Sequence, residues 1–554
     1  MDVVLKGDTP RGGFQGNKGA PWVLGGILLL AFALRVCPMK DLTCGSLYFG
    51  EAQTMADAAL PLSKIASWLV KDQGPLKFYL LHAVLYFGRS EVLLRAPAIF
   101  FDLASILLLF YLGTWLFNRK AAFLACFFMA VSVWHIHYAT SAKNYPLYIF
   151  LILANTAFLY RATQSRGIHF WLLFAITEAL AFYAFFPSVL ILTIQTCWFF
   201  LCCGKHRDLT KRFLVSLGLF GALVVPWGYR LMVAFGRKRD FGTGDWGLRG
   251  PEIWGALRDH FGGISGPYPW GIFIFVLSFI WVFHSQKTRS QALLLFMLVT
   301  MQLCFYVFCF FVFHISVVPR YFFLIYPFFL LMAAAGIVSW THWIGRLAGT
   351  LVFLLPLCLY GLCQVGLIDC RHIPSDYLRH EEDFAAMASL IEKNHDALDF
   401  VAVESSPAIL GIQYYFDKTN KSPVMILCKN LDHDRYFMYA NSNITLYGID
   451  GDLPLLKYLA SAGRLLVVDV GHTGNFKNGD SIISWLKSNA FRVERGGGAI
   501  FYFISPPRGI SGDYKESSAV ARERLFLGAH LERRLIYPFN REEWARKKWG
   551  LYEY

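Results

Sequence analysis

The sequence predicts a polytopic α-helical membrane protein with about eleven spans and a C-terminal soluble α/β domain. Of the 554 residues, 56% are hydrophobic, and the mean hydropathy is +0.44. Soluble domains are only about 45–50% apolar, so a water-soluble globule could not bury this much apolar surface. A third observation is a change near residue 368, where long apolar runs give way to alternating helix-like and strand-like segments.

The charge of the chain points to membrane topology. The formal net charge is +14, although only 16% of the residues are charged. In a soluble protein this excess would suggest a nucleic-acid partner, but here the basic residues gather between hydrophobic runs. We therefore expect membrane lipids, and no nucleic acid, as partners.

The first apolar run, Pro21 to Val36, follows a polar and basic segment, residues 1–20. No small-residue cleavage site follows the run, and Arg35 stands where a lipoprotein-processing site would need a small or apolar residue. We therefore expect an uncleaved first span preceded by a cytoplasmic N-terminal tail.

Ten further apolar runs follow, most of them close to the roughly 20 residues that cross a bilayer as a helix. Together with the first span they form a predicted membrane domain over residues 21–368. The ten runs lie near 93–117, 121–138, 145–161, 169–184, 187–203, 211–230, 268–285, 291–314, 320–343 and 347–368.

Threading these spans in order places every short basic loop on the side of the N-terminus, as the positive-inside rule requires. The segment Leu76–Phe87 is also apolar, but an additional span there would invert every later loop, so we expect it along the outer interface. The outer side then carries loops 38–92 and 231–267 and the C-terminal domain. The predicted location is the inner membrane of a bacterium. The basic clusters are Asn118–Lys120, Arg161–Arg166, Lys205–Arg212, Lys287–Arg289 and Arg346.

Residues 369–506 are predicted to form the extracytoplasmic α/β domain. The glycines 496–498 lie between two strand-like segments and do not open a helix, so we predict a hairpin turn and no nucleotide site. The tail 507–554 is basic and aromatic, and is either a solvated helix or a segment that docks on a membrane or a protein partner. The helix-like segments are 381–394, 408–416 and 453–462, and the strand-like ones are 400–403, 465–470, 491–493 and 499–504.

Cysteine spacing supports no metal site, because the sequence has no CxxC and no HExxH pattern. Most of the twelve cysteines lie inside predicted spans. Cys37, Cys44, Cys370 and Cys428 fall outside, where pairs such as 37 with 44 could form, and the sequence leaves the pairing open. We expect neither a metal nor a cofactor.

Six motifs occur along the chain in an order typical of one family. They are Gly45–Ala52, Gly74–His82, Ser90–Ala98, Tyr111–Arg119, His135–Tyr145 and Pro319–Tyr321. In this order they resemble the protein O-mannosyltransferase and aminoarabinose-transferase group. The resemblance implies the GT-C fold, a polyprenyl-phosphate sugar donor, and metal-independent, inverting transfer to an acceptor on the extracytoplasmic face.

The predicted topology places four ionisable residues at the outer ends of spans, where charged groups call for a functional reason. In this family an acid in the first outer loop acts as the base, and the resemblance implies that role for Glu51. Cations would stabilise the charge that grows on the departing phosphate. The predicted site therefore has Glu51 as catalytic residue and Arg320, Lys143, Lys77, Tyr145 and Tyr138 as substrate-binding residues.

The chain departs from the family pattern at three places. Gly50-Glu51 replaces Asp-Glu, and Ser141 and Lys143 stand where Gln-Glu-Ala-Arg-x-Tyr has Glu and Arg. The segment 183–186 reads Tyr-Ala-Phe-Phe, where the family often has Tyr-Thr-His-Tyr. Acids in the second outer loop are candidates to replace the missing ones, namely Asp240, Asp245 and Asp259.

Several alternatives stay open at this point. Glu51 could be a loop acid that caps the helix beginning near Ala52, and Lys77 and Lys143 could extend toward lipid headgroups. The chain could also be a catalytically degenerate relative that binds protein partners through its C-terminal domain and tail. A secondary transporter is less favoured, because no paired half-chain repeat is seen.

Two histidines need a separate interpretation. His135 and His137 are two positions apart and do not share a helical face. We therefore expect interface residues bonded to neighbouring backbone, and no shared metal ion.

Overall fold

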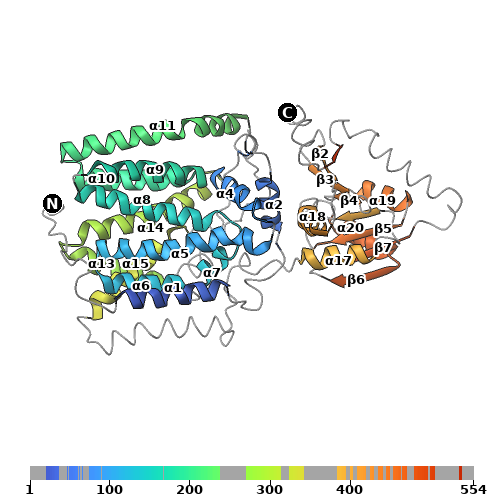
Figure 1. Ribbon diagram of the computed structural model, residues 1–554, viewed down its shortest axis with the longest axis horizontal. Helices are drawn as coiled ribbons and strands as arrows, with labels where there is room; N and C mark the ends of the chain where they lie inside the picture. The colour runs from blue at the N-terminus through green and yellow to red at the C-terminus, as the bar shows by residue number, and fades with distance from the viewer. Residues whose placement is uncertain are drawn as a thin grey trace. The chain divides into compact units, whose positions relative to one another are not determined.

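The structure is a computed structural model, and it divides into two compact units (Figure 1). The helical unit comprises residues 1–44 and 62–378, and the sheet unit comprises residues 45–61 and 379–554. Each unit is described by itself. The described residues are 20–36, 47, 49–59, 62, 65, 74–88, 90–165, 167–237, 270–313, 324–341, 383–394, 400–403, 408–419, 424–429, 435–440, 445–448, 453–462, 464–470, 479–496, 499–505 and 536–538.

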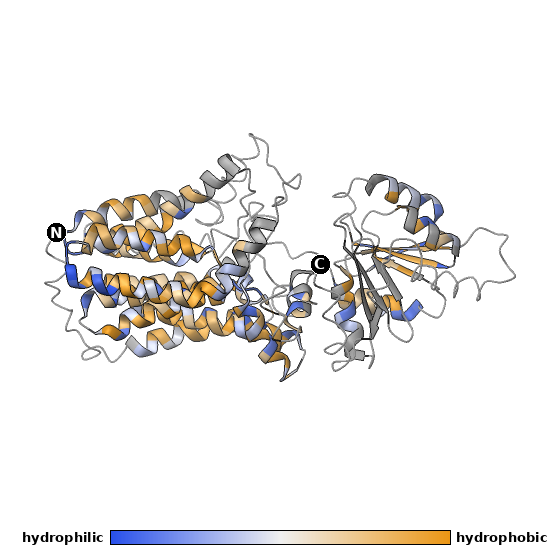
Figure 2. Cartoon of the chain, turned by 90° about the horizontal axis from the view of Figure 1, so that it is seen from above, coloured by the Kyte–Doolittle hydropathy of each residue, from blue (hydrophilic) through white to orange (hydrophobic). Residues whose placement is uncertain are grey.

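The helical unit consists of apolar helices, which Figure 2 shows as mainly hydrophobic along most of their length. Within the described residues, three are long and apolar enough to cross a membrane: α5, α8 and Arg207–Tyr229 of α11. The helices are α1 (Ala20–Val36), α4 (Leu76–Leu85), α5 (Glu91–Leu116), α6 (Arg119–Val131), α7 (Val133–Ala139), α8 (Tyr145–Gln164), α9 (Ile168–Ala184), α10 (Ser188–Cys203), α11 (Arg207–Arg237), α13 (Trp270–His284), α14 (Arg289–Phe313) and α15 (Tyr326–Thr341).

Most predicted runs correspond to one helix each, but the run 121–138 is two helices. Ser132 adopts an extended conformation between α6 and α7, and its hydroxyl accepts a hydrogen bond from the His135 backbone N–H at 3.5 Å. A serine that caps a new helix interrupts the series of backbone hydrogen bonds but not the apolar pattern of the sequence, so hydropathy does not detect the break. The predicted span 347–368 lies outside the described residues.

Helix α8 lies at the centre of the bundle and α11 at its periphery. In the most apolar stretch of α8, 83% of the residues are buried, compared with 11% in α11. Helix α8 packs against α5 and α9, and α11 packs against α9 (Figure 1). The outward-facing side of α11 carries large apolar residues, including Val215, Val225 and Tyr229, as expected for a helix in contact with lipid.

Three ionisable side chains meet in the interior of the bundle, and all three are buried. Arg35 Nε of α1 donates to Asp102 Oδ2 of α5 at 2.6 Å, and His135 Nδ1 of α7 lies 3.0 Å from Asp102 Oδ1. Arg35 also donates to the carbonyl of Ala130 at 2.9 Å, at the end of α6. The group therefore links α1, α5, α6 and α7.

The expectation for His135 was wrong. It is fully buried, and its Nδ1 atom contacts the Asp102 carboxylate, so it does not lie at an interface. His135 lies in the first turn of α7 and reaches Asp102 of α5. His137, two positions later, is only partly buried. Asp102 is 33 positions away in the sequence, so no local pattern could indicate the contact.

The sheet unit contains an eight-stranded sheet with the order β6-β7-β5-β1-β4-β3-β2-β8. Strand β1 is parallel to β4 and β5, and the remaining pairs are antiparallel. The strands are β1 (Phe400–Val403), β2 (Val424–Lys429), β3 (Arg435–Ala440), β4 (Thr445–Gly448), β5 (Leu465–Asp469), β6 (Arg492–Gly496), β7 (Ala499–Ile504) and β8 (Ile536–Pro538).

Helices cover both faces of this sheet. Helices α17 (Phe384–Asn394) and α18 (Ala408–Thr419) pack on the face that includes Leu466 of β5. Helices α19 (Leu453–Ala462) and α20 (Gly479–Asn489) pack on the face that includes Val467. Adjacent residues of a strand point to opposite faces, so β5, which is buried throughout, supplies both cores.

Two segments outside the predicted C-terminal domain belong to the sheet unit. Helix α2 (Phe49–Ala58) packs against α18, and the Leu47 N–H donates to the Tyr415 hydroxyl at 2.9 Å. Strand β8 comes from the basic tail and pairs with β2. This part of the tail is therefore a strand and not a solvated helix. Strands β6 and β7 pair with Gly496 opposite Ala499, in agreement with the predicted hairpin.

The close contact between α13 and α15 generates the first prediction. A Cβ on Gly336 of α15 would lie 2.0 Å from the Ser278 hydroxyl and 2.6 Å from Ser278 Cα in α13. We expect Gly336→Ala to destabilise the protein by about 1–3 kcal/mol, the usual cost of overpacking. The measurement is the apparent melting temperature in detergent. Gly221→Ala in α11 is the control, because no atom of the described residues lies within 4 Å of its Cβ position. A Gly336 variant as stable as this control would contradict the prediction.

The buried ion pair generates the second prediction. Asp102→Leu would leave Arg35 buried without its carboxylate, and we expect a loss of about 3–5 kcal/mol in the free energy of unfolding. The double variant Arg35→Met/Asp102→Leu should lose less, since it removes both charges. Denaturant titration of the three proteins measures the difference. Equal stability of the single variant and the wild type would show that the pair does not stabilise the bundle.

Candidate functional site

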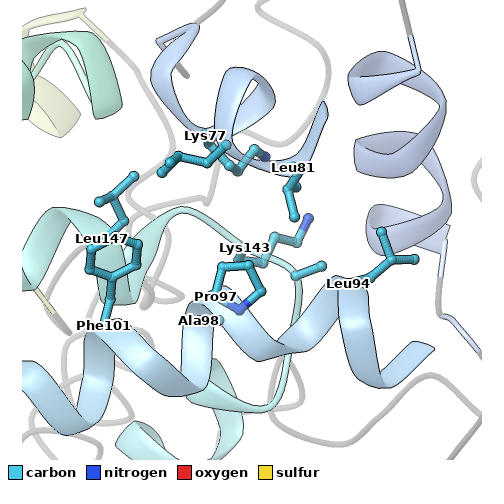
Figure 3. A pocket seen from close by; sticks show the side chains of 10 residues that line it. Lys77, Leu81, Leu94, Pro97, Ala98, Phe101, Lys143 and Leu147 are labelled. Carbon is cyan, nitrogen blue, oxygen red and sulfur yellow. The ribbon is translucent and has the colours of Figure 1, made fainter. Parts of the chain in front are cut away.

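A pocket in the helical unit brings together two of the predicted substrate-binding residues (Figure 3). Lys77 of α4 and Lys143 of the loop between α7 and α8 both line it. The rest of the lining is apolar and comes from α4, α5, the same loop and α8, with Leu81, Phe101 and Leu147 among its residues. The pocket therefore combines two cations with a wall suited to hydrocarbon.

Lys77 occupies the first turn of α4 and is held close to the protein. Its side chain is only 4% exposed, and its ammonium group lies 4.3 Å from the centroid of the Phe78 ring. A cation over an aromatic face is attracted by the ring quadrupole. This contact holds the Lys77 ammonium group beside the Phe78 ring at the pocket.

Lys143 lies in a tight loop that closes the end of α7. The Thr140 hydroxyl donates to the Ile136 carbonyl at 2.9 Å, and the Ser141 hydroxyl donates to the Tyr138 carbonyl at 3.1 Å. The Lys143 N–H donates to the Ser141 carbonyl at 2.7 Å. Each hydroxyl thus adds a second hydrogen bond to a carbonyl that already accepts from a backbone N–H at the end of α7, which ties the loop to the helix.

Two ammonium groups are the charged groups among the described residues that line the pocket. Like charges that line one largely apolar pocket add to a local positive potential, which favours an anion. An anion with an attached hydrocarbon chain would satisfy both the cations and the apolar wall. The arrangement is therefore chemically suited to the phosphate of a lipid.

Tyr138 and Tyr145 contact each other. Their rings meet edge to face with centroids 4.9 Å apart, and both side chains are buried. They lie at the two ends of the Lys143 loop and do not line the pocket. The structure therefore places them as supports of the loop.

Glu51 belongs to the sheet unit, in the first turn of α2, and its side chain is buried. The helix begins at Phe49, slightly before the predicted start near Ala52. A carboxylate in the first turn interacts favourably with the helix dipole. Arg320 lies outside the described residues, as do Asp240, Asp245 and Asp259.

Four residues that shape the interior were missed from the sequence. Arg35 and Asp102 are charged residues within apolar spans, and that signal alone marks a position as significant. Gly74 and Asn144 both bond to the end of α9, as analysed below. A glycine before a proline and an asparagine at a helix start are common features, so their sequence signal is weak.

Comparison with known proteins supports a family assignment for part of the chain. Residues 72–229 match the sequence model of the family described as dolichyl-phosphate-mannose-protein mannosyltransferase. The matched segment contains every residue that lines the pocket. No protein among curated sequences matches the chain.

Solved structures share the fold over most of the chain. ArnT from Cupriavidus metallidurans in the apo state aligns with a TM-score of 0.55 and 12% sequence identity, over 89% of this chain and 100% of ArnT. The same protein bound to undecaprenyl phosphate aligns with a TM-score of 0.53 and 11% identity, over 88% and 99% of the two chains. At this identity the likeness is one of fold, and it agrees with the resemblance seen in the motifs. The chain therefore has the GT-C glycosyltransferase fold, and its residues 72–229 match the model of the dolichyl-phosphate-mannose-protein mannosyltransferase family.

Proposed function

We propose that the chain is a membrane glycosyltransferase that transfers a sugar from a polyprenyl-phosphate donor to an acceptor on the extracytoplasmic face. The observation that carries the proposal is the pocket of the helical unit, in which Lys77 and Lys143 stand at one apolar wall. A polyprenyl-phosphate sugar has a matching structure, because a phosphate joins its hydrocarbon chain to its sugar.

The charge of the donor changes during the reaction in a way that two cations favour. The donor phosphate is a diester with one negative charge, and the departing polyprenyl phosphate is a monoester that gains a second charge near neutral pH. Cations that bind the growing charge more strongly than the initial one lower the barrier. Two lysines at the phosphate would therefore contribute to turnover as well as to binding.

Two further findings support the proposal. The segment that matches the mannosyltransferase family includes the whole lining of the pocket. ArnT from Cupriavidus metallidurans, which has the same fold, has been crystallised with undecaprenyl phosphate.

We assign the remaining roles from the sequence. Glu51 accepts the proton of the acceptor hydroxyl, whose oxygen attacks the anomeric carbon while the bond from that carbon to the phosphate oxygen breaks. Arg320 joins the lysines at the phosphate, since a guanidinium suits bidentate phosphate recognition. The contact between the Tyr138 and Tyr145 rings, in place of the predicted substrate binding, supports the Lys143 loop. This direct displacement inverts the anomeric centre and needs no metal ion.

We also propose the orientation on which the outer face depends. The N-terminus is cytoplasmic, residues 21–368 form the membrane domain, and residues 369–506 lie outside a bacterial inner membrane. The support is the sorting of basic clusters to one side of the predicted spans.

The binding role generates a prediction about the two lysines. Lys77→Gln and Lys143→Gln each remove one cation at similar size, and we expect each to weaken undecaprenyl phosphate binding about 10- to 100-fold, as for a lost charge-assisted contact. The dissociation constant in lipid nanodiscs is the measurement. Lys120→Gln, at an exposed site at the start of α6 that does not line the pocket, should bind as the wild type does. Unchanged affinity in both pocket variants would refute the phosphate site.

The catalytic role generates a separate prediction. Glu51→Gln keeps the side-chain shape but removes the proton acceptor, and loss of a general base typically lowers the rate about 100- to 10,000-fold. Affinity for the donor should persist in this variant, whereas Arg320→Ala should lose both affinity and turnover. The assay incubates the purified protein with a panel of polyprenyl-phosphate sugars and measures release of polyprenyl phosphate. Wild-type protein that binds the lipid phosphate but never turns over would instead indicate a degenerate relative with a binding role.

A further inference from the structure

One backbone carbonyl anchors both of the segments that carry the pocket lysines. The carbonyl of Ala184, the last residue of α9, accepts a hydrogen bond from the Gly74 N–H at 3.2 Å. It also accepts one from Asn144 Nδ2, again at 3.2 Å. Gly74 lies three positions before Lys77, and Asn144 directly follows Lys143. The last carbonyls of a helix have no intrahelical partner, so this acceptor is available for both bonds.

Asn144 makes this bond in place of the usual local one. It occupies the N-cap position of α8, yet its side chain forms no cap hydrogen bond. An asparagine at this position normally accepts from the first backbone N–H groups of the helix and stabilises it. Here the side chain is 1% exposed and donates across to α9. The side chain therefore joins the start of α8 to the end of α9.

Gly74 approaches α9 closely enough to exclude any other residue. A Cβ at this position would lie 2.0 Å from the Tyr183 carbonyl oxygen and 2.4 Å from the carbonyl carbon. Both atoms are backbone, so no side-chain rotation relieves the contact. The start of α4 can therefore bond to Ala184 only with glycine at 74.

We propose that Asn144 and Gly74 are positioning residues, which set the spacing of the Lys143 and Lys77 ammonium groups through their shared bond to Ala184 and thereby determine affinity for the lipid phosphate. This inference rests on the proposed function. Neither lysine is held by its own element alone, because Lys143 lies in a loop and Lys77 in the first turn of α4. The end of α9 is the common reference for both.

The test is a double-mutant cycle on the affinity of the full-length protein for undecaprenyl phosphate in nanodiscs. Asn144→Ala should weaken binding roughly tenfold, within the range of coupling energies between adjacent residues. If Asn144 acts by placing Lys143, the same change in a Lys143→Gln background should have almost no further effect on the dissociation constant. Additive losses would overturn the inference, because they would mean that Asn144 acts independently of Lys143.

A matched control separates positioning from stability. Asn155 of α8 is also buried, and its Nδ2 also donates to a main-chain carbonyl of α9, that of Phe174, at 3.0 Å. Within the described part of the chain, the Oδ1 atom of neither asparagine has a hydrogen-bond partner. Asn155→Ala should lower the melting temperature about as much as Asn144→Ala while leaving the affinity unchanged. An equal loss of affinity in both variants would also overturn the inference.

Substitution of Gly74 provides an independent test of the inference. Gly74→Ala should weaken binding in the wild type and have little further effect in a Lys77→Gln background. If Lys77→Gln and Lys143→Gln weaken binding but the effects of Asn144→Ala and Gly74→Ala simply add to theirs, the positioning role alone is refuted. Loss of any effect in Lys77→Gln and Lys143→Gln would refute the phosphate site itself, so the two failures are distinguishable.

Discussion

The arrangement of the helical unit depends on how the buried carboxylate of Asp102 is neutralised. An ionised acid inside an apolar bundle is tolerated only with a charged partner and good hydrogen bonds. Arg35 supplies the opposite charge at 2.6 Å, and His135 approaches the second oxygen at 3.0 Å. These two bonds require α1 and α7 to contact α5 at the position of Asp102. The bond from Arg35 to the Ala130 carbonyl also attaches the end of α6 to this group. The position of α7 in turn determines where the Lys143 loop begins.

A second constraint of the same kind acts at the other end of that loop. Backbone groups at helix ends need partners in an environment with little water, and the Ala184 carbonyl finds them in Gly74 and Asn144. The segment 183–186 lacks the polar side chains that the resembled family often has there. A main-chain acceptor does not depend on side-chain identity. The loss of those side chains is therefore compatible with an intact anchor for the two lysine segments.

The candidate functions of this protein are divided between its two units. The cationic pocket belongs to the helical unit, whereas Glu51 belongs to the sheet unit through α2, which packs on α18. Binding and proton transfer can therefore be examined on separate residues. Two of the departures from the family pattern remove acids, whereas Lys143 keeps the basic character of the arginine that the pattern has at its position.

The sequence by itself determined the class of the protein, because class depends on composition and on local periodicity. Apolar runs predicted most helices of the bundle, motif order predicted the GT-C fold, and Lys77 and Lys143 were predicted as binding residues from their type and place. Only the tertiary structure decided which residues meet: Asp102 with Arg35 and His135, Ala184 with Gly74 and Asn144, and β8 with β2. It also divided the run 121–138 at Ser132 and placed Tyr138 against Tyr145 instead of in the pocket. The physical reason is that hydropathy reports the environment of each residue along the chain, whereas hydrogen bonds and ion pairs depend on distances between residues far apart in sequence, which folding alone establishes.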